Sequence, residues 1–189
     1  MSGQGTADRL VAAAMAILRA EGAQAVTMRR VAAEVGVTAM ATYRHFPNRE
    51  ALLRAVVDLG VAEVVAGWGK RRSRTFKGRV DALADDFLDF ALGDRNLYAL
   101  VMAERWEGAR RLDEFAGSPA FAPVLDVVRQ GVRDGVLRDA DPLEITLALT
   151  TPVLGLVQLH HGGRIELSEK DFRALCKRTV GRVLDGVAT

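Results

Sequence analysis

Side chains that can bind phosphates and read base edges gather between Thr27 and Arg49. Hydroxyl, phenol, imidazole and guanidinium groups donate hydrogen bonds to phosphate oxygens, and arginine is also the usual two-point partner of guanine. The methyl surfaces of Ala39 and Met40 can touch thymine methyl groups. This stretch is therefore predicted to contact duplex DNA. The candidate residues are Thr27, Arg29, Thr38, Ala39, Met40, Thr42, Tyr43, Arg44, His45 and Arg49.

Three of these candidates have a second interpretation. Arg44 fits a phosphate contact as well as it fits base reading. Tyr43 could pack as a core aromatic with only its hydroxyl at the surface. His45 could close its helix without touching DNA. The spacing of the residues leaves these alternatives open.

Two short helices joined by a tight turn are predicted to hold these side chains. A helix with one apolar face is expected over 28–35, and Gly36 supplies the left-handed residue that ends it. Thr38 caps a second helix over 39–45, and Pro47 stops that helix because the residue before a proline is pushed out of helical space. Such a helix-turn-helix can place its second helix in the major groove of DNA.

The run GVTAMATYRHFPNREALL resembles the recognition segment of the TetR family of bacterial transcriptional regulators. That family's pattern is Gly-Val, a Ser or Thr cap, small residues, Tyr-x-His-Phe, an Asn or Asp cap, a basic residue and Glu-x-Leu-Leu. The residues in register with it are Thr38, Tyr43, His45, Phe46, Asn48, Glu50, Leu52 and Leu53. The resemblance is detailed from about Thr6 to Ala55 and covers only the helical layout beyond.

The resemblance implies a ligand-responsive DNA-binding transcriptional regulator. Such a protein would be a repressor that binds a palindromic operator as a homodimer and is released by a small-molecule effector. In the family the positions of Tyr43, His45 and Arg49 contact the DNA backbone, and Arg49 stands here in place of the commoner lysine. Met40 stands where many relatives have glycine, so the resemblance leaves the operator sequence open.

Charge is distributed unevenly along the 189 residues, although the net charge is only +2. Residues 1–54 carry seven arginines and four acidic residues, 55–79 carry six basic and two acidic residues, and 80–189 carry 13 basic and 18 acidic residues. A basic front end with an acidic remainder suits a protein that touches polyanions with one end.

Cys176 is the single cysteine, and no signal peptide is evident, so a reducing cytoplasm is expected. No membrane span is expected, because the most apolar run, 143–159, contains Glu144 and Pro152.

Helical periodicity continues to the end of the chain, and strand-type alternation is hard to find. The fold class expected is all-α, with about nine helices. The resemblance implies an N-terminal three-helix helix-turn-helix head, joined by a long fourth helix over 49–67 to a helical ligand-binding and dimerisation body. The two functional domains are accordingly placed at 1–54 and 55–189.

The last two predicted helices offer wide apolar stripes that could pair with a second copy as a four-helix bundle. The residues assigned to this interface are Leu147, Leu154, Val157, Phe172, Leu175, Thr179 and Val183. The same stripes would serve equally as internal core, and the pattern does not separate the two uses.

A ligand cavity in the body is implied by the family resemblance rather than by a motif. The residues chosen for it are Phe87, Phe90, Met102, Trp106, Phe121 and Gln158. Each of them is as consistent with plain core packing as with a pocket wall.

No enzyme, cofactor or metal motif was found in the sequence. His160 and His161 are adjacent and therefore point about 100° apart on a helix, which disfavours joint chelation. The protein is interpreted as a non-enzyme without cofactor or metal. The alternatives are a small all-helical enzyme, or a protein-interaction module, that reuses the same fold.

Overall fold

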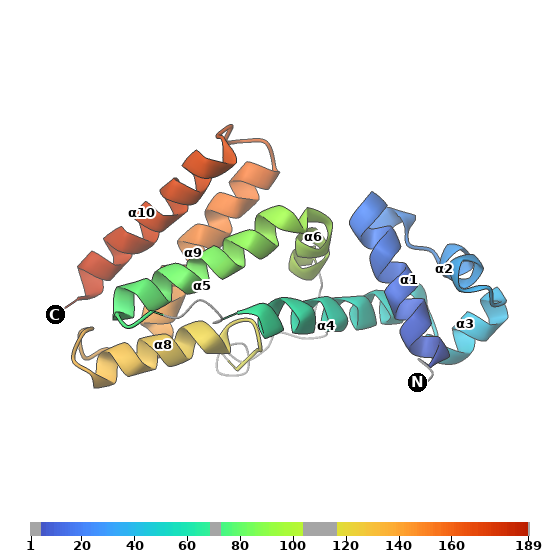
Figure 1. The fold of residues 1–189 in the computed structure, drawn as a ribbon, viewed down its shortest axis with the longest axis horizontal. Helices are drawn as coiled ribbons and strands as arrows, with labels where there is room; N and C mark the ends of the chain where they lie inside the picture. The colour runs from blue at the N-terminus through green and yellow to red at the C-terminus, as the bar shows by residue number, and fades with distance from the viewer. Residues whose placement is uncertain (1–4, 69–72, 104–116, 189) are drawn as a thin grey trace. The chain divides into compact units, whose positions relative to one another are not determined.

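The computed structural model describes residues 5–68, 73–103 and 117–188 of the chain, and Figure 1 shows its course. Over these residues the chain forms nine α-helices and one short 3-10 helix, with no strand beyond an isolated bridge between Leu137 and Ala188. The predicted all-α fold class is therefore confirmed. In chain order the elements are α1 (Thr6–Glu21), η1 (Ala23–Ala25), α2 (Met28–Val35), α3 (Ala39–His45), α4 (Arg49–Gly67), α5 (Phe76–Gly93), α6 (Arg95–Ala103), α8 (Ala122–Arg133), α9 (Pro142–His161) and α10 (Glu169–Val187).

The chain divides into two compact units. The first, called the head unit here, comprises residues 1–66 and 92–108, and the second, called the body unit, comprises 67–91 and 109–189. By packing, most of α4 and all of α6 therefore group with the helix-turn-helix. The functional boundary expected after Arg54 stays a prediction.

The head unit is built on α1, which packs against α2, α3 and η1. Its core consists of side chains that the helical spacing turns inward on each element. The most deeply buried are Leu10, Ala14, Leu18, Val26, Val31, Leu52 and Val56, each at 0% exposure. Burial of one such side chain stabilises the fold by about 1.5–3 kcal/mol. The two short helices are therefore held by tertiary packing, since helices of this length are marginal alone.

Helix α6 joins the head unit through both polar and apolar contacts. Arg19 of α1 donates from Nε to Asp94 at 2.7 Å and from Nη2 to Glu63 of α4 at 3.0 Å. Asn96 donates from Nδ2 to the Arg19 carbonyl at 3.0 Å. Gly60 of α4 lets Leu97 approach closely, since a Cβ there would lie 2.6 Å from Leu97 Cδ2. Helix α6 is thus fastened to α1 and α4 together.

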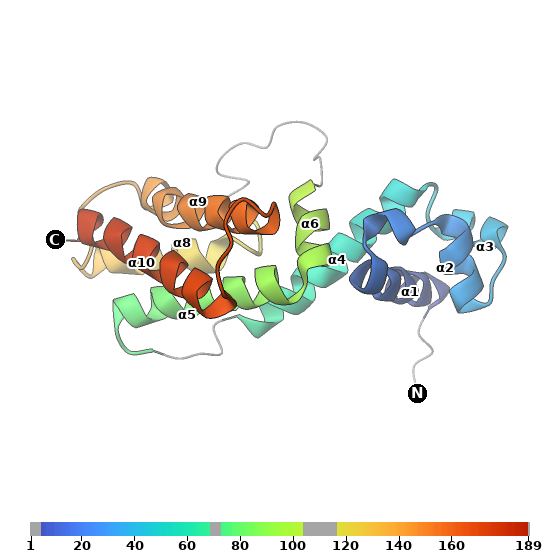
Figure 2. The same ribbon diagram turned by 90° about the horizontal axis from the view of Figure 1, so that it is seen from above.

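The body unit contains α5, α8, α9 and α10. Helix α9 packs against both α8 and α10, and Figure 2 shows α9 and α10 running beside each other. Two ion pairs join α10 to α5: Lys177 with Asp85 and Arg173 with Asp89, both at 2.8 Å. Both C-terminal helices begin at a residue of a type favoured at helix starts. Asp141 accepts a hydrogen bond from the Leu143 amide at 2.8 Å, and Ser168 accepts one from the Asp171 amide at 3.1 Å.

Two residues assigned to a dimer interface are instead core of the body unit. Val157 and Phe172 are both 0% exposed, and the Phe172 ring stacks on His160 with centroids 4.3 Å apart. That part of the prediction is wrong, because these side chains point between α9 and α10 within one chain. Leu147 also packs inward, against the cluster of Phe121 and Leu125. The other four residues, Leu154, Leu175, Thr179 and Val183, are half-buried.

Helix α9 is, among the described helices, long and apolar enough to cross a membrane by length and composition. The core helix of a soluble protein meets the same criterion, so this single helix is weak evidence for a membrane span. Only 28% of its apolar window is buried within the chain. The outward residues Ala148, Thr151, Gly155 and Leu159 are all exposed, and their spacing puts them on one face of the helix.

Candidate nucleic-acid interface

Helix α3 presents its side chains from a well-capped start. The Thr38 hydroxyl accepts a hydrogen bond from the Ala41 amide at 3.1 Å, which satisfies one of the unpaired donors of the first turn. Gly36 has φ 73°, the left-handed conformation that ends α2 and turns the chain into α3. The predicted helix-turn-helix is therefore present, with the bounds that the caps and Pro47 specify.

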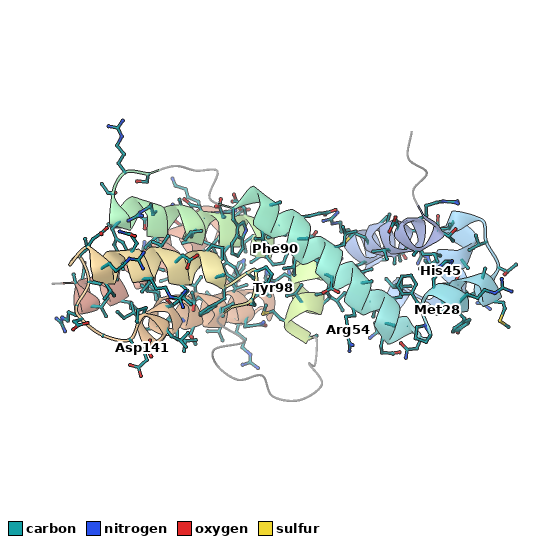
Figure 3. All side chains as sticks on the ribbon, turned by 90° about the horizontal axis from the view of Figure 1, so that it is seen from below. Met28, His45, Arg54, Phe90, Tyr98 and Asp141 are labelled. Carbon is teal, nitrogen blue, oxygen red and sulfur yellow. The ribbon has the colours of Figure 1, made fainter. Side chains whose placement is uncertain are left out.

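The outer face of α3 carries large and polar side chains that nothing in the head unit covers. Met40 is 70% exposed and Tyr43 is 50% exposed. Thr38, Arg44 and His45 are also exposed, and Ala39 is half-buried. Figure 3 places His45 at the end of α3. The exposed side chains make this face accessible to another molecule.

Helix α2, which packs against α3, carries two further exposed candidates. Thr27 is exposed and caps α2 by accepting a hydrogen bond from the Arg30 amide at 3.3 Å. Arg29 is exposed, whereas Met28, labelled in Figure 3, is buried in the head unit. Arg29 and Arg44 make no ion pair or hydrogen bond with another residue in the described part of the chain. Their charges are consequently available to an outside partner.

Arg30, beside Arg29, is already paired within the head. Its guanidinium donates two hydrogen bonds to the Glu21 carboxylate, one of them at 2.8 Å. These bonds lower the pKa of Glu21 and raise the pKa of Arg30. This pair explains why adjacent arginines on one short helix do not contribute equally to the positive surface.

Thr42 is not on the exposed face, which corrects its assignment as a DNA contact. It is 0% exposed, and its hydroxyl lies 3.5 Å from the Thr38 carbonyl oxygen inside the helix. The residue therefore lies on the side of α3 that packs inward. A hydroxyl in a short amphipathic helix looks like a surface group in the sequence, and only the packing shows otherwise.

Arg49 is also placed differently from the expectation of an open phosphate contact. Its Nε donates to the Val26 carbonyl at 2.7 Å and its Nη2 donates to the Ala23 carbonyl at 2.5 Å. The side chain is half-buried by this contact. Two of the five N–H groups of the guanidinium therefore bind backbone oxygens of the head unit.

Arg9 is a functional candidate that the sequence analysis did not single out. Its Nη2 donates to the Val35 carbonyl at 2.7 Å, at the C-terminal end of α2. No motif marks this arginine, which is one of several charged residues on α1, together with Asp8 and Arg19. Its partner is a backbone atom, which leaves no trace in the sequence.

One hollow in the described part of the body unit has a volume of about 290 Å³ and is lined by Gly117, Ala122, Leu125, Arg129, Asp141, Pro142 and Leu143. None of the predicted pocket residues lines this hollow, and the pocket assignment stays a prediction. Phe121 is buried in the neighbouring core cluster, and Phe87 and Phe90 are half-buried on α5. Met102 is 43% exposed and Gln158 lies on the exposed side of α9. Trp106 lies outside the described residues.

The described residues hold no group of three or more His, Cys, Asp or Glu side chains placed to bind a metal ion. Cys176 is buried, and its burial raises the pKa of the thiol to about 11. A thiol in that state is not a nucleophile at neutral pH. The chemistry concentrated at one place in the described structure is thus the exposed cationic and hydroxyl-bearing face of α2 and α3.

Two family models match the chain. One, described as bacterial regulatory proteins of the tetR family, matches residues 10–56, and one described as a tetracyclin repressor-like C-terminal domain matches residues 80–183. The chain belongs to the tetR family of bacterial regulatory proteins. It is accordingly a DNA-binding transcriptional regulator.

Similar proteins extend the two matches. The chain is 47% identical over 53 residues to the HTH-type transcriptional repressor DrrR1 of Streptomyces coeruleorubidus, a stretch that covers 28% of this chain and 20% of DrrR1. A protein of unknown function from Rhodococcus sp. RHA1 has a similar structure, with a TM-score of 0.81, 24% identity and coverage of 100% and 98% of the two chains. FadR from Bacillus subtilis, solved with stearoyl-CoA, has a TM-score of 0.72 at 15% identity, covering 95% and 98%. At these identities the structural similarity shows the fold.

Proposed function

We propose that this tetR-family regulator is a repressor that binds a palindromic operator as a homodimer and releases it when a small molecule binds the body unit. The observation that carries the DNA-binding part is the exposed face of α3, where Met40, Tyr43 and Arg44 project from a rigidly capped helix. A helix of this size fits the major groove of B-form DNA.

The contacts divide between base reading and phosphate binding. Arg44, Ala39 and Met40 would face base edges, with Arg29 at the margin. Phosphate contacts would come from the hydroxyl, phenol and imidazole groups that surround them, which belong to Thr27, Thr38, Tyr43 and His45. Thr42 is left out of this set because it is buried.

Dimerisation through α9 and α10 would bring two recognition helices to one duplex. Support comes from the exposed face of α9, where Ala148, Thr151 and Gly155 are small and Leu159 is apolar, beside the half-buried Leu154. Small residues allow two helices to approach closely, and a two-fold axis pairs this face with itself. Thr151→Arg would introduce a charge in the middle of that face. Sedimentation should then show a monomer that binds the operator weakly, whereas an unchanged dimer would place the interface elsewhere.

Release by an effector would require the body unit to alter the head unit. The chain passes from α5 directly into α6, and α6 is tied to α1 and α4 through Asp94, Arg19 and Glu63. A ligand that shifts α6 would therefore shift α4 and the recognition helix with it. Relatives of the same fold include a flavonoid-responsive regulator, FrrA, and FadR in complex with stearoyl-CoA, which supports an effector of low polarity for this protein.

The protein is proposed to work in the cytoplasm and to carry out no catalysis. It would meet DNA there in a reducing environment that suits its single buried cysteine. No observation on the described residues favours the enzyme or the protein-interaction alternative.

The test is binding of the purified protein to a duplex from the region upstream of its own gene. Fluorescence anisotropy should show tighter binding to that duplex than to a scrambled duplex of the same composition, since base contacts discriminate and phosphate contacts do not. Equal affinities with equal salt dependence would exclude specific regulation of that region. Addition of a matching effector should then reduce the affinity.

A further inference from the structure

We infer that Arg49 is a positioning residue that fixes the helix-turn-helix on α4, rather than a phosphate contact. The inference rests on the proposed DNA binding by α3. Arg49 is the first residue of α4, directly after Asn48, whose Oδ1 accepts a hydrogen bond from the Ala51 amide at 2.7 Å. The arginine therefore projects from a capped and well-fixed helix start.

Its guanidinium holds the segment that leads into α2. Nε donates to the carbonyl of Val26 at 2.7 Å and Nη2 donates to the carbonyl of Ala23 at 2.5 Å. Val26 is 0% exposed and immediately precedes Thr27, the N-cap of α2. The planar guanidinium reaches both oxygens with donors in a fixed geometry, which the single ammonium group of lysine does not reproduce.

A second arginine holds the other end of the same helix. Arg9 of α1 donates from Nη2 to the carbonyl of Val35 at 2.7 Å, in the last turn of α2. Helix α2 is thus held at its start from α4 and at its end from α1. Because α3 packs on α2 across the tight turn at Gly36, the direction of α3 depends on both arginines.

The two roles for Arg49 make different predictions about salt. A residue that neutralises a phosphate adds about 0.9 to the slope of log affinity against log salt concentration. Substitution of a residue that positions the recognition helix would weaken the contacts between that helix and the base edges. It would therefore lower the ratio of specific to non-specific affinity. Loss of charge alone would weaken binding to every duplex equally.

The experiment compares Arg49→Lys and Arg49→Gln with the wild-type protein, and uses Arg30→Gln as a control that removes an exposed arginine of the head. The probes are the duplex most enriched by the wild type from a random library and a scrambled duplex of the same composition, each titrated over a range of salt. Both Arg49 variants should bind the selected duplex at least about tenfold more weakly, which corresponds to about 1.4 kcal/mol. Their affinity for the scrambled duplex and their salt slopes should match those of the control. A slope reduced by about 0.9 in Arg49→Gln and restored in Arg49→Lys would overturn the inference.

Amide hydrogen exchange of the DNA-free protein provides an independent readout. Exchange over residues 23–35 should be faster in both Arg49 variants than in the wild type, and Arg9→Gln should affect the C-terminal part of this segment. Unchanged exchange in Arg49→Lys would overturn the inference. That variant keeps the charge and the aliphatic stem, so it decides the matter if Arg49→Gln does not fold. If the wild type selects no duplex, the proposed function fails, while the exchange measurement still decides the role of Arg49.

Discussion

The exposed faces of α3 and α9 differ in the kind of side chain they present. Helix α3 exposes long and polar groups, among them Tyr43 and Arg44, on a helix of seven residues. Helix α9 exposes Ala148, Thr151 and Gly155 on a helix of 20 residues. Long polar groups can reach into a groove and pair with a polyanion, whereas a smooth apolar face fits the matching face of another helix. The difference matches the two proposed contacts, DNA for the head unit and a second copy of the chain for the body unit.

The same two regions differ in how they are held together. In the head unit, arginines on α1 and α4 donate to backbone carbonyls at both ends of α2. In the body unit, α10 is held by apolar packing of Phe172 and by side-chain ion pairs with α5. Hydrogen bonds to the backbone fix orientation, and apolar burial supplies stability without a single required geometry. Substitutions of these residues should therefore change the orientation of α2 and α3 in the head unit and the stability of the fold in the body unit.

The largest expected effect is on the body core. Phe172→Ala should lower the free energy of unfolding by about 3–5 kcal/mol, because it leaves a cavity between α9 and α10. Chemical denaturation at several protein concentrations measures it, with Leu175→Ala, half-buried on the same helix, as the matched variant. Phe172→Ala should destabilise at every concentration. If it instead weakened only the dimer and left the unfolding of the monomer unchanged, Phe172 would belong to the interface after all.

On the recognition surface, Arg44→Ala should cost about 1–3 kcal/mol of binding to the selected duplex and relax the preference at one base pair. Its thermal stability should match that of the wild type, because the side chain is exposed and makes no contact within the described head. Arg30→Ala is the control, since that arginine is paired with Glu21. Equal weakening of all sequences by Arg44→Ala would assign Arg44 to a phosphate.

The two units each offer a helix cap of the same chemistry. Thr38→Ala and Ser168→Ala should each reduce stability by about 1 kcal/mol, since each removes a hydroxyl that accepts an amide hydrogen bond at 3.1 Å. Only Thr38→Ala should also reduce DNA affinity, which anisotropy would detect. A matching loss of affinity in Ser168→Ala would mean that the two regions are not distinct in function.

The smallest expected effect concerns the exposed pair of Glu21 and Arg30. The hydrogen bonds from Arg30 lower the pKa of Glu21 in the folded protein, so the pair stabilises the fold above the unfolded-state pKa of the carboxyl. That contribution is lost as the pH falls through the folded-state pKa. Glu21→Gln should therefore be slightly less stable than the wild type at neutral pH and equally stable in acid. A stability difference that grows on acidification would contradict the assignment.

The sequence predicted the head in detail because its signals are local. Thr27, Gly36, Thr38 and Pro47 each specify a backbone conformation at one position, and the bounds of α2 and α3 follow from them. Asp141 and Ser168 cap the starts of α9 and α10 by the same local chemistry. Caps act within one turn of helix, so they can be read without knowledge of the fold.

The assignments that failed depend on contacts between distant parts of the chain. Val157 and Phe172 lie on stripes with helical spacing, and the spacing alone does not say whether a stripe faces its own chain or a partner. The phosphate contact of Arg49 stays a prediction, and two of its five N–H groups donate to carbonyl groups more than 20 residues earlier in the sequence. Backbone acceptors leave no pattern of residue types. Which groups these side chains contact can be known only from the packed structure.

The most direct test of DNA recognition by α3 is to select bound sequences from a library of random duplexes and sequence them. The wild-type protein should enrich a palindrome whose half-sites are centred about one helical turn, or a multiple of it, apart, since two α3 helices would read it. Arg44→Ala should enrich the same palindrome with one symmetric pair of positions relaxed. Failure of the wild type to enrich any sequence, or enrichment that is unaffected by changes at Met40, Tyr43 and Arg44, would contradict the assignment of α3 as the recognition helix.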